Sequence, residues 1–373
     1  MPRRRTPRKA RSLLRSLLPA ASRKRAPRPP KPARAPKAGR LPEIVPLPGP
    51  LPAIPRPARR RQGSGRWVRG GRSAPVGGRS YDVYLPAGLR PRSRVPMVLL
   101  LHGCGQTSAE FASATRFTDV ADRNGFVLVL PHQETRHHPN RCWRWYEVGN
   151  QSRGAGEPAA LTVVVRQVLA EQVRWRIDPR RVYVAGLSAG GAMALTLAAT
   201  YPDVFAAAGV HSAPPYRSAS SGGQGLSAMA GRTIVPPPVP GVAKEMAPVV
   251  VLQGTADHLV RPLNGDRVAD QWLAYRTAAA AGGPDPGRIG RTRADSGRTT
   301  DGREYTVVRW YSVRGRKMLE YWLVDGLGHA WSGGRKGGSY SDPTGPRAAT
   351  VMWQFFRTHR SAGSSLARRA AGM

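Results

Sequence analysis

A serine flanked by glycines is the first residue of this chain whose surroundings suggest catalysis. Ser188 lies in residues 186–190, which read Gly-Leu-Ser-Ala-Gly and match the pattern G-x-S-x-G. Residues 181–185 before it favour a strand, and the Ala- and Leu-rich residues 191–199 after it favour a helix. A strand, a tight turn and a helix form the nucleophile elbow, which presents a serine hydroxyl where the helix N-terminus stabilises an anion. We therefore expect Ser188 to be a nucleophile rather than an ordinary capping serine.

A serine at its ordinary pKa is a poor nucleophile, so a base must accompany it. In the fold that carries this elbow, the base is a histidine on a loop after the last strand. His329 meets this condition, because it follows the strand-like residues 318–324 and lies among glycines that permit a tight loop. His359 lies in a polar terminus beyond the last helical segment. His329 is the predicted base.

The acid that orients the base should lie between the nucleophile and the base in the chain. Asp257 follows the apolar residues 249–252 and therefore falls at the carboxyl end of a buried strand, where ligand-facing residues of α/β sheets lie. Asp325 is the main competitor, but it is too close in sequence to His329 to face its ring easily. The order Ser188, Asp257, His329 is that of the α/β-hydrolases.

A sharp turn over residues 101–106, Leu-His-Gly-Cys-Gly-Gln, follows another apolar strand. Such a turn supplies one amide of an oxyanion hole, and the residue after the nucleophile supplies the second. We expect these amides to come from Cys104 and Ala189, and we expect His102 to be a structural residue of the turn.

The elements that must position these residues are strands and helices in alternation. Residues 81–85 alternate as a strand does. Short apolar runs predict buried strands over 96–101, 126–130, 182–185, 206–210 and 249–252, followed by late strands over 305–313 and 318–324. Helix-length segments cover 108–124, 158–176, 189–200, 264–281 and 347–358. This alternation is typical of an α/β fold with a mostly parallel central sheet and helices on both faces. Residues 283–303 are expected to form an excursion before the late strands.

Charge and proline divide the chain. Of the net charge of +37, residues 1–61 carry +18, and they also hold fifteen prolines. High charge with little apolar surface predicts a disordered Pro/Arg-rich basic tail over 1–75, a catalytic domain over 76–360 and a short disordered tail over 361–373. No stretch has the apolar length of a transmembrane helix.

Two cysteines exclude a disulfide scaffold or a four-cysteine metal cluster. Cys104 and Cys142 both lie in loops that follow strands, so a disulfide between them and a pair of free thiols stay open alternatives. The basic start of the chain is followed by Ser12, Leu13 and Leu14, but Arg15 and Pro19 interrupt this apolar stretch, which leaves no clear signal peptide.

Four motifs occur in order: Leu101-His102-Gly103-Cys104-Gly105-Gln106, Arg141-Cys142-Trp143-Arg144-Trp145-Tyr146, Gly186-Leu187-Ser188-Ala189-Gly190-Gly191 and Gly326-Leu327-Gly328-His329-Ala330-Trp331. Together they resemble the poly(3-hydroxybutyrate) depolymerase family of esterases over roughly residues 80–358. The resemblance implies an α/β-hydrolase fold, a serine carboxylesterase without a metal or cofactor, and Ser188, Asp257 and His329 at the triad positions. It also implies a secreted or surface location, although the tail departs from the usual cleavable signal, so a cytoplasmic location is the alternative.

The expected activity is hydrolysis of hydroxyalkanoate oligomers or polymers through an acyl-enzyme. A feruloyl or acetylxylan-type esterase acting on plant polysaccharide is the first alternative. The second is a polyanion-binding protein that acts through its basic tail by weak, salt-sensitive contacts. Trp143 and Trp331 are predicted to line the substrate pocket, whereas Trp145 and Tyr146 fit core packing equally well.

Overall fold

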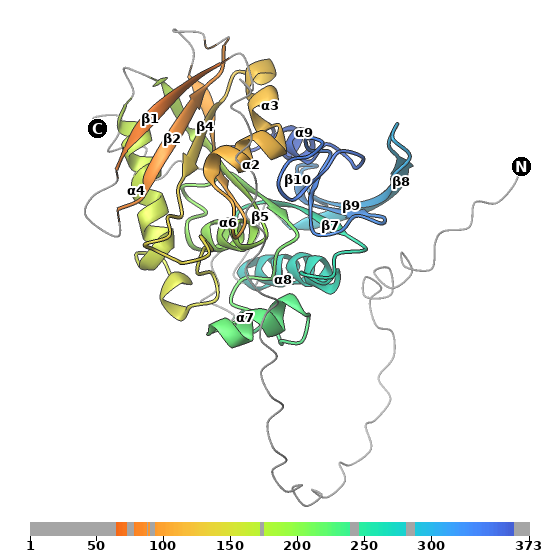
Figure 1. Cartoon of the computed structure of the whole chain (residues 1–373). Helices are drawn as coiled ribbons and strands as arrows, with labels where there is room; N and C mark the ends of the chain where they lie inside the picture. The colour runs from red at the N-terminus through yellow and green to blue at the C-terminus, as the bar shows by residue number, and fades with distance from the viewer. Residues whose placement is uncertain are drawn as a thin grey trace, which may run out of the picture. The chain divides into compact units, whose positions relative to one another are not determined.

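A ten-stranded sheet lies at the centre of the chain (Figure 1). The computed structural model describes residues 65–72, 78–87, 89, 94–171, 175–238, 246–280 and 288–361. Most of the predicted N-terminal tail, and the predicted C-terminal tail beyond Ser361, lie outside the described residues. Within these ranges, no helix combines the length and apolar content that crossing a membrane requires.

The strands of this sheet follow the order β1-β2-β4-β3-β5-β6-β7-β10-β9-β8. Their bounds are Arg66–Arg72 (β1), Ser80–Leu85 (β2), Val95–Leu101 (β3), Val127–Pro131 (β4), Ile177–Leu187 (β5), Ala207–His211 (β6), Val249–Gly254 (β7), Ile289–Arg298 (β8), Glu304–Ser312 (β9) and Lys317–Val324 (β10). The pairs from β4 to β10 are parallel, and the outer pairs on both sides are antiparallel. Every residue of β3, β4, β6 and β7 is buried, as expected for parallel strands covered on both faces.

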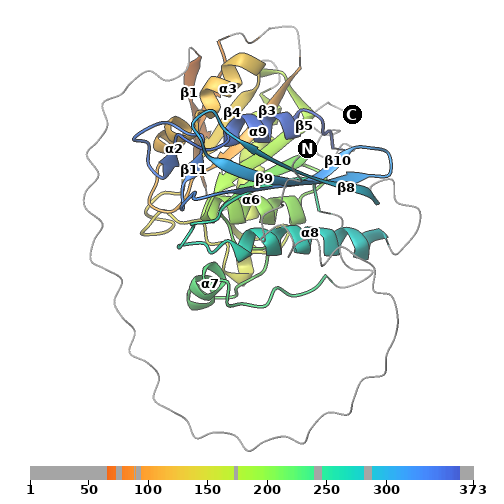
Figure 2. The ribbon, with the colours of Figure 1, turned by 90° about the vertical axis from the view of Figure 1, so that its right-hand side faces the viewer.

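Helices cover both faces of the sheet. Their bounds are Ser108–Thr115 (α2), Phe117–Asn124 (α3), Gly156–Ala170 (α4), Ala189–Thr200 (α6), Gly222–Met229 (α7), Leu263–Ala280 (α8) and Ala348–Phe356 (α9). Helices α2, α3 and α9 cover one face of the sheet and share a hydrophobic core with it. Helices α4, α6 and α8 cover the other face of the sheet. Figure 2 shows α6 and α8 on one side of the sheet and α9 on the opposite side. The α/β-hydrolase fold predicted from the sequence is confirmed.

One predicted helix is two helices in the structure. The segment 108–124 is divided at Arg116, which adopts the left-handed conformation with φ of 59°. That conformation ends the hydrogen-bond ladder of α2, and α3 starts from the same residue. A capping box between Thr107 and Glu110 fixes the other end of α2. The predicted helix over 158–176 is also too long, because α4 ends at Ala170.

Two edge strands were not predicted. Residues 289–298 form β8 rather than an irregular excursion, and almost all of its side chains are exposed. An edge strand that is exposed on both faces has no apolar alternation, so the sequence carries no strand signal there. Residues 66–72 form β1, which pairs with β2. The sheet therefore includes residues that were assigned to the tail, and the predicted domain start at residue 76 is too late.

We expect β1 to contribute measurably to stability. Deletion of residues 1–64 should leave the free energy of unfolding unchanged. Deletion of residues 1–75 should lower it by about 2 kcal/mol, because the β1–β2 ladder and the contact between Trp67 and Tyr84, with ring centroids 5.1 Å apart, are lost. Urea unfolding of the two truncated chains measures the difference. Equal stabilities would show that β1 contributes nothing.

Candidate active site

Ser188 lies on a strained turn between β5 and α6. Its φ of 56° and ψ of −122° are rare for a residue with a side chain, and such strain persists only where the surroundings impose it. The Ser188 amide donates to the His211 carbonyl at 2.9 Å, which fixes the turn to β6. The glycines of the motif are sterically required: a Cβ at Gly190 would lie 2.2 Å from the Leu101 carbonyl oxygen, and one at Gly186 would lie 2.3 Å from the Gly190 carbonyl carbon.

The predicted base and acid are hydrogen-bonded to each other. His329 Nδ1 lies 2.9 Å from Asp257 Oδ2, and Asp257 Oδ1 accepts from the amides of Leu259 at 3.0 Å and Val260 at 2.8 Å. Burial alone would raise the pKa of Asp257, but hydrogen bonds, first from His329, outweigh burial and hold the pKa below its ordinary value. The ionised carboxylate keeps the proton of the neutral His329 ring on Nδ1, so that Nε2 is the nitrogen that can accept a proton.

Asp325, the competing acid, has a different role in the structure. Its carboxylate accepts from the Thr255 hydroxyl at 3.0 Å, and the same hydroxyl accepts from the Gly326 amide at 2.8 Å. Asp325 is exposed. Its hydrogen bond with Thr255 links the chain just after β10 to the chain just after β7. The structure places Asp257, not Asp325, beside His329.

The loop after β3 runs against the nucleophile. A Cβ added at Gly103 would lie 3.7 Å from the Ser188 Cβ. The Gly103 amide donates to Gln106 Oε1 and the Gly105 amide donates to the Asn140 carbonyl, whereas the Cys104 amide has no hydrogen-bond partner among the described residues. Ala189 is the first residue of α6, so its amide has no intrahelical acceptor. Both predicted oxyanion-hole amides are therefore available.

A disulfide and a histidine join this loop to the segment after β4. Cys104 and Cys142 form a disulfide. His102, fully buried, accepts at Nε2 from the Gln133 amide at 3.2 Å, and the Gln133 side chain donates to the Cys142 carbonyl at 2.8 Å. Burial lowers the pKa of His102 to about 4, so its ring is neutral and acts as an acceptor here. His102 is a structural residue of the turn, as the sequence predicted.

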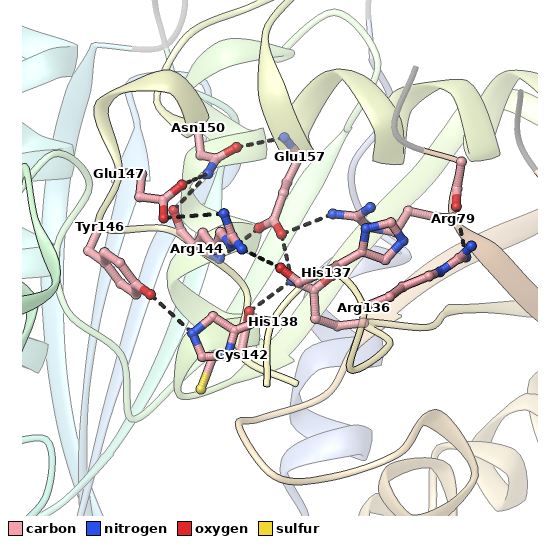
Figure 3. A network of polar contacts seen from close by, with 12 residues as sticks. Arg79, Arg136, His137, His138, Cys142, Arg144, Tyr146, Glu147, Asn150 and Glu157 are labelled. Atoms are coloured by element: carbon pink, nitrogen blue, oxygen red, sulfur yellow. Dashed lines mark hydrogen bonds and ion pairs between the residues drawn. The ribbon is translucent and has the colours of Figure 1, made fainter. Parts of the chain in front are cut away.

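A buried carboxylate, Glu157, stabilises the segment after β4. Glu157 accepts from Arg79 Nη2 at 3.0 Å and from the Arg144 amide at 2.7 Å (Figure 3). It also accepts from Gln133 Nε2 at 2.5 Å. Burial raises the pKa of Glu157 above its ordinary value, against the opposing charge of Arg79. The sequence analysis missed Glu157 and Gln133, because contacts between residues far apart in the chain leave no local pattern.

The two tryptophans predicted to line the pocket are buried. Trp143 and Trp331 are both 0% exposed. Trp143 donates from Nε1 to the His102 carbonyl at 3.0 Å, and Trp331 packs edge-on against Phe111, with ring centroids 5.5 Å apart. A side chain without accessible surface cannot touch a substrate in this conformation. The prediction is corrected accordingly: these rings pack beneath the site and hold its loops.

His211 and Ser212 are further residues that the sequence analysis did not predict. They lie at the end of β6, and the His211 ring stacks on Trp331 with ring centroids 5.2 Å apart. A polar pair directly after a buried apolar run at the carboxyl edge of the sheet was the signal available in the sequence.

Comparisons with known proteins give a family and a fold. The family model described as "Esterase PHB depolymerase" matches residues 79–297. Poly(3-hydroxyalkanoate) depolymerase C of Paucimonas lemoignei is 30% identical over 264 residues, 66% of this chain and 57% of that protein. Poly(3-hydroxybutyrate) depolymerase of Ralstonia pickettii is 37% identical over 131 residues, 34% of this chain and 26% of that protein. The chain thus spans only part of the length of both.

Other proteins similar to this chain are named for other esters. Feruloyl esterase B of Neurospora crassa is 30% identical over 215 residues, 54% of this chain and 70% of that protein. The solved structure of acetyl xylan esterase from Aspergillus awamori has a TM-score of 0.58 at 19% identity and covers 79% of this chain and 100% of its own. At that identity the likeness shows the fold alone.

Substitution of the two candidate acids should separate their roles. Asp257→Asn should lower kcat by about 10⁴-fold with the fold intact, because the amide turns a donor toward the ring and selects the wrong His329 tautomer. Asp325→Asn, the matched control, should lose about tenfold or less. Measuring kcat/KM of both variants at one pH makes the comparison, and a larger loss for Asp325→Asn would overturn the assignment.

Removal of the disulfide should affect both stability and rate. Cys142→Ser should lower the free energy of unfolding by about 2–4 kcal/mol and lower kcat by roughly 10-fold to 100-fold, because the loop that carries the Cys104 amide loses its covalent anchor. Chemical unfolding and steady-state kinetics measure the two effects. Alkylation of both cysteines in the native, unreduced protein would contradict the disulfide itself.

Proposed function

Because this chain belongs to the esterase PHB depolymerase family, we propose that it is a serine esterase that hydrolyses carboxylic esters through an acyl-enzyme. The observation that carries the proposal is the hydrogen bond of 2.9 Å between His329 and the buried Asp257, at the sheet edge that also presents Ser188 on its strained turn. A positioned base with its orienting acid activates a serine hydroxyl.

The reaction would proceed in two halves. His329 Nε2 takes the Ser188 hydroxyl proton as the oxygen attacks the ester carbonyl, and Asp257 stabilises the imidazolium that forms. The Cys104 and Ala189 amides donate to the oxyanion. The alcohol leaves with the proton from His329. Water then attacks the acyl-enzyme along the same proton path, which releases the acid and restores Ser188; these steps require neither a metal ion nor a cofactor.

The substrate we favour is a hydroxyalkanoate ester, as an oligomer or a polymer. Two exposed apolar side chains near the triad support an apolar ester: Tyr340, 41% exposed, has its ring centroid 6.0 Å from that of His329, and Leu259, 49% exposed, lies two residues after Asp257. The depolymerase relatives point to the same class. The alternative is a feruloyl or acetyl ester on plant polysaccharide, which is what other relatives are named for.

For location we propose secretion or exposure on the cell surface, with the cytoplasm as the alternative. The Cys104–Cys142 disulfide supports this, because such bonds persist in oxidising compartments and are rare in the cytosol. Weak contact of the basic residues 1–61 with polyanions remains a separate proposal.

The central test is Ser188→Ala, which should lower kcat by on the order of 10⁶ on p-nitrophenyl esters from C2 to C12 while circular dichroism is unchanged. The matched control is Ser227→Ala, because residues 225–228 repeat the sequence Gly-Leu-Ser-Ala away from the elbow. Retention of more than a few per cent of activity in Ser188→Ala would overturn the mechanism. Release of acid from hydroxybutyrate oligomers, compared with methyl ferulate and acetylated xylan, separates the substrate classes.

A further inference from the structure

Tyr340 presents an exposed aromatic ring beside the candidate base. Its ring centroid lies 6.0 Å from that of His329, and the two rings meet edge to face with 79° between their planes. Tyr340 is 41% exposed, whereas the side chain of His329 is only 10% exposed. Among the described residues, the Tyr340 hydroxyl has no hydrogen-bond partner. The ring therefore offers open apolar surface to a molecule bound next to His329.

The backbone holds Tyr340 in a conformation that a side chain disfavours. Its φ of 47° lies in the left-handed region. The Tyr340 carbonyl accepts from the Trp331 amide at 2.7 Å, next to the parallel pairing of β11 (Trp331–Ser332) with β12 (Ser341–Asp342). Strain of this kind persists only where the surroundings impose it, and it is frequent where a side chain contacts a ligand.

The residue before Tyr340 is tied to the oxyanion loop. Gln106, 1% exposed, donates from Nε2 to the Ser339 carbonyl at 3.0 Å and accepts at Oε1 from the Gly103 amide at 2.9 Å. On the other side, the hydrogen bond from Trp331 leads to the loop that carries His329. Tyr340 is thus fixed to both halves of the site, and its ring keeps its place while a substrate binds.

The proton transfer decides which part of an ester lies next to this ring. In acylation, Ser188 Oγ bonds to the carbonyl carbon, the bond from that carbon to the alcohol oxygen breaks, and the alcohol oxygen takes the proton from His329 Nε2. That transfer requires the alcohol oxygen to lie within about 3 Å of Nε2. The group attached to the alcohol oxygen therefore extends beside the His329 ring, which is where Tyr340 is exposed.

We propose that Tyr340 forms the subsite for the alcohol part of the ester, as an aromatic wall against which the carbon chain of the alcohol packs. The inference rests on the proposed esterase function. It names the preferred substrates as esters whose alcohol carries several carbon atoms, such as the next unit of a hydroxyalkanoate chain, rather than methyl esters. Tyr340 contacts the substrate and transfers no proton.

The proposal predicts selectivity for the alcohol that is separate from selectivity for the acid. Esters of one acid with different alcohols share the same acyl-enzyme, so kcat/KM compares the steps up to acylation, in which the alcohol is still bound. A methylene that is fully buried in an apolar site is worth about fourfold in binding, so contact with one side of a ring should be worth about twofold. A purely structural role of Tyr340 would change the rate on all esters by the same factor.

The test uses two series of esters. Methyl, ethyl, propyl and butyl butyrate vary the alcohol and are assayed by titration of the released acid, whereas p-nitrophenyl acetate, butyrate and octanoate vary the acid. The deciding variant is Tyr340→Asn, because asparagine tolerates the left-handed backbone and lacks the ring. From methyl to butyl butyrate we expect kcat/KM of the wild type to rise about eightfold and that of Tyr340→Asn to rise less than about twofold. The dependence on acyl length should be the same in both proteins.

Three further variants complete the comparison. Tyr340→Phe keeps the ring and should retain the dependence on the alcohol. Tyr340→Gly fits the left-handed backbone without strain and provides a second measurement without the ring. Val313→Asn is the matched control, because Val313 is an apolar residue, 59% exposed, just after β9. It should match the wild type in both series.

The outcomes separate this inference from the proposed function. If the wild type hydrolyses both series but shows no dependence on the alcohol, or if Tyr340→Asn and Tyr340→Gly keep that dependence, the inference is overturned while the esterase proposal stands. Loss of the dependence on acyl length in these variants, or an equal loss of alcohol dependence in Val313→Asn, also overturns it. A wild-type protein that hydrolyses none of the esters overturns the proposed function instead.

Discussion

Burial of the Asp257 carboxylate is the constraint on which the rest of the site depends. The residue is 1% exposed, and an unpaired charge in such a place costs several kcal/mol. Its donors come from separate parts of the chain: the loop after β7, the loop that carries His329, and the Gln253 side chain on β7 at 3.4 Å. The carboxylate is stable only when these segments meet. The acid of the triad is therefore also the group that requires the strand ends to assemble.

The sheet order supplies that meeting point. Strands β3, β5, β6, β7 and β10 are consecutive and parallel, so their carboxyl ends share one edge. The oxyanion loop, the nucleophile, the His211–Ser212 pair, the acid and the base each follow one of these strands in turn. Backbones approach closely there, which is why Gly186 and Gly190 admit no side chain.

What the sequence made predictable follows from this geometry. Ser188, Asp257 and His329 each follow a buried apolar strand. Such strands can be predicted from the sequence because they are short apolar runs. The edge strand β8 and residues 66–69 of β1 lack that pattern because most of their side chains are exposed. The burial of Trp143 and Trp331 was missed because proximity to a catalytic motif in sequence does not say which side of a loop faces solvent. The partners of Glu157 and His211 depend on contacts between residues far apart in the chain.

The two sides of the site are held by different physical means, and they meet at the nucleophile. On the oxyanion side, the loop is held by a covalent bond and, through Gln133, by the buried ion pair of Glu157 with Arg79. On the acid–base side, the Asp257 carboxylate accepts from His329 and from two loop amides, and the buried His211 ring accepts from the Ser332 amide in the loop that carries His329. Ser188 lies between them, with Gly103 against its side chain and the His211 carbonyl on its amide. Its strained backbone can persist because both sides fix it, and a strained serine held in this way loses little entropy on reaching the attacking geometry.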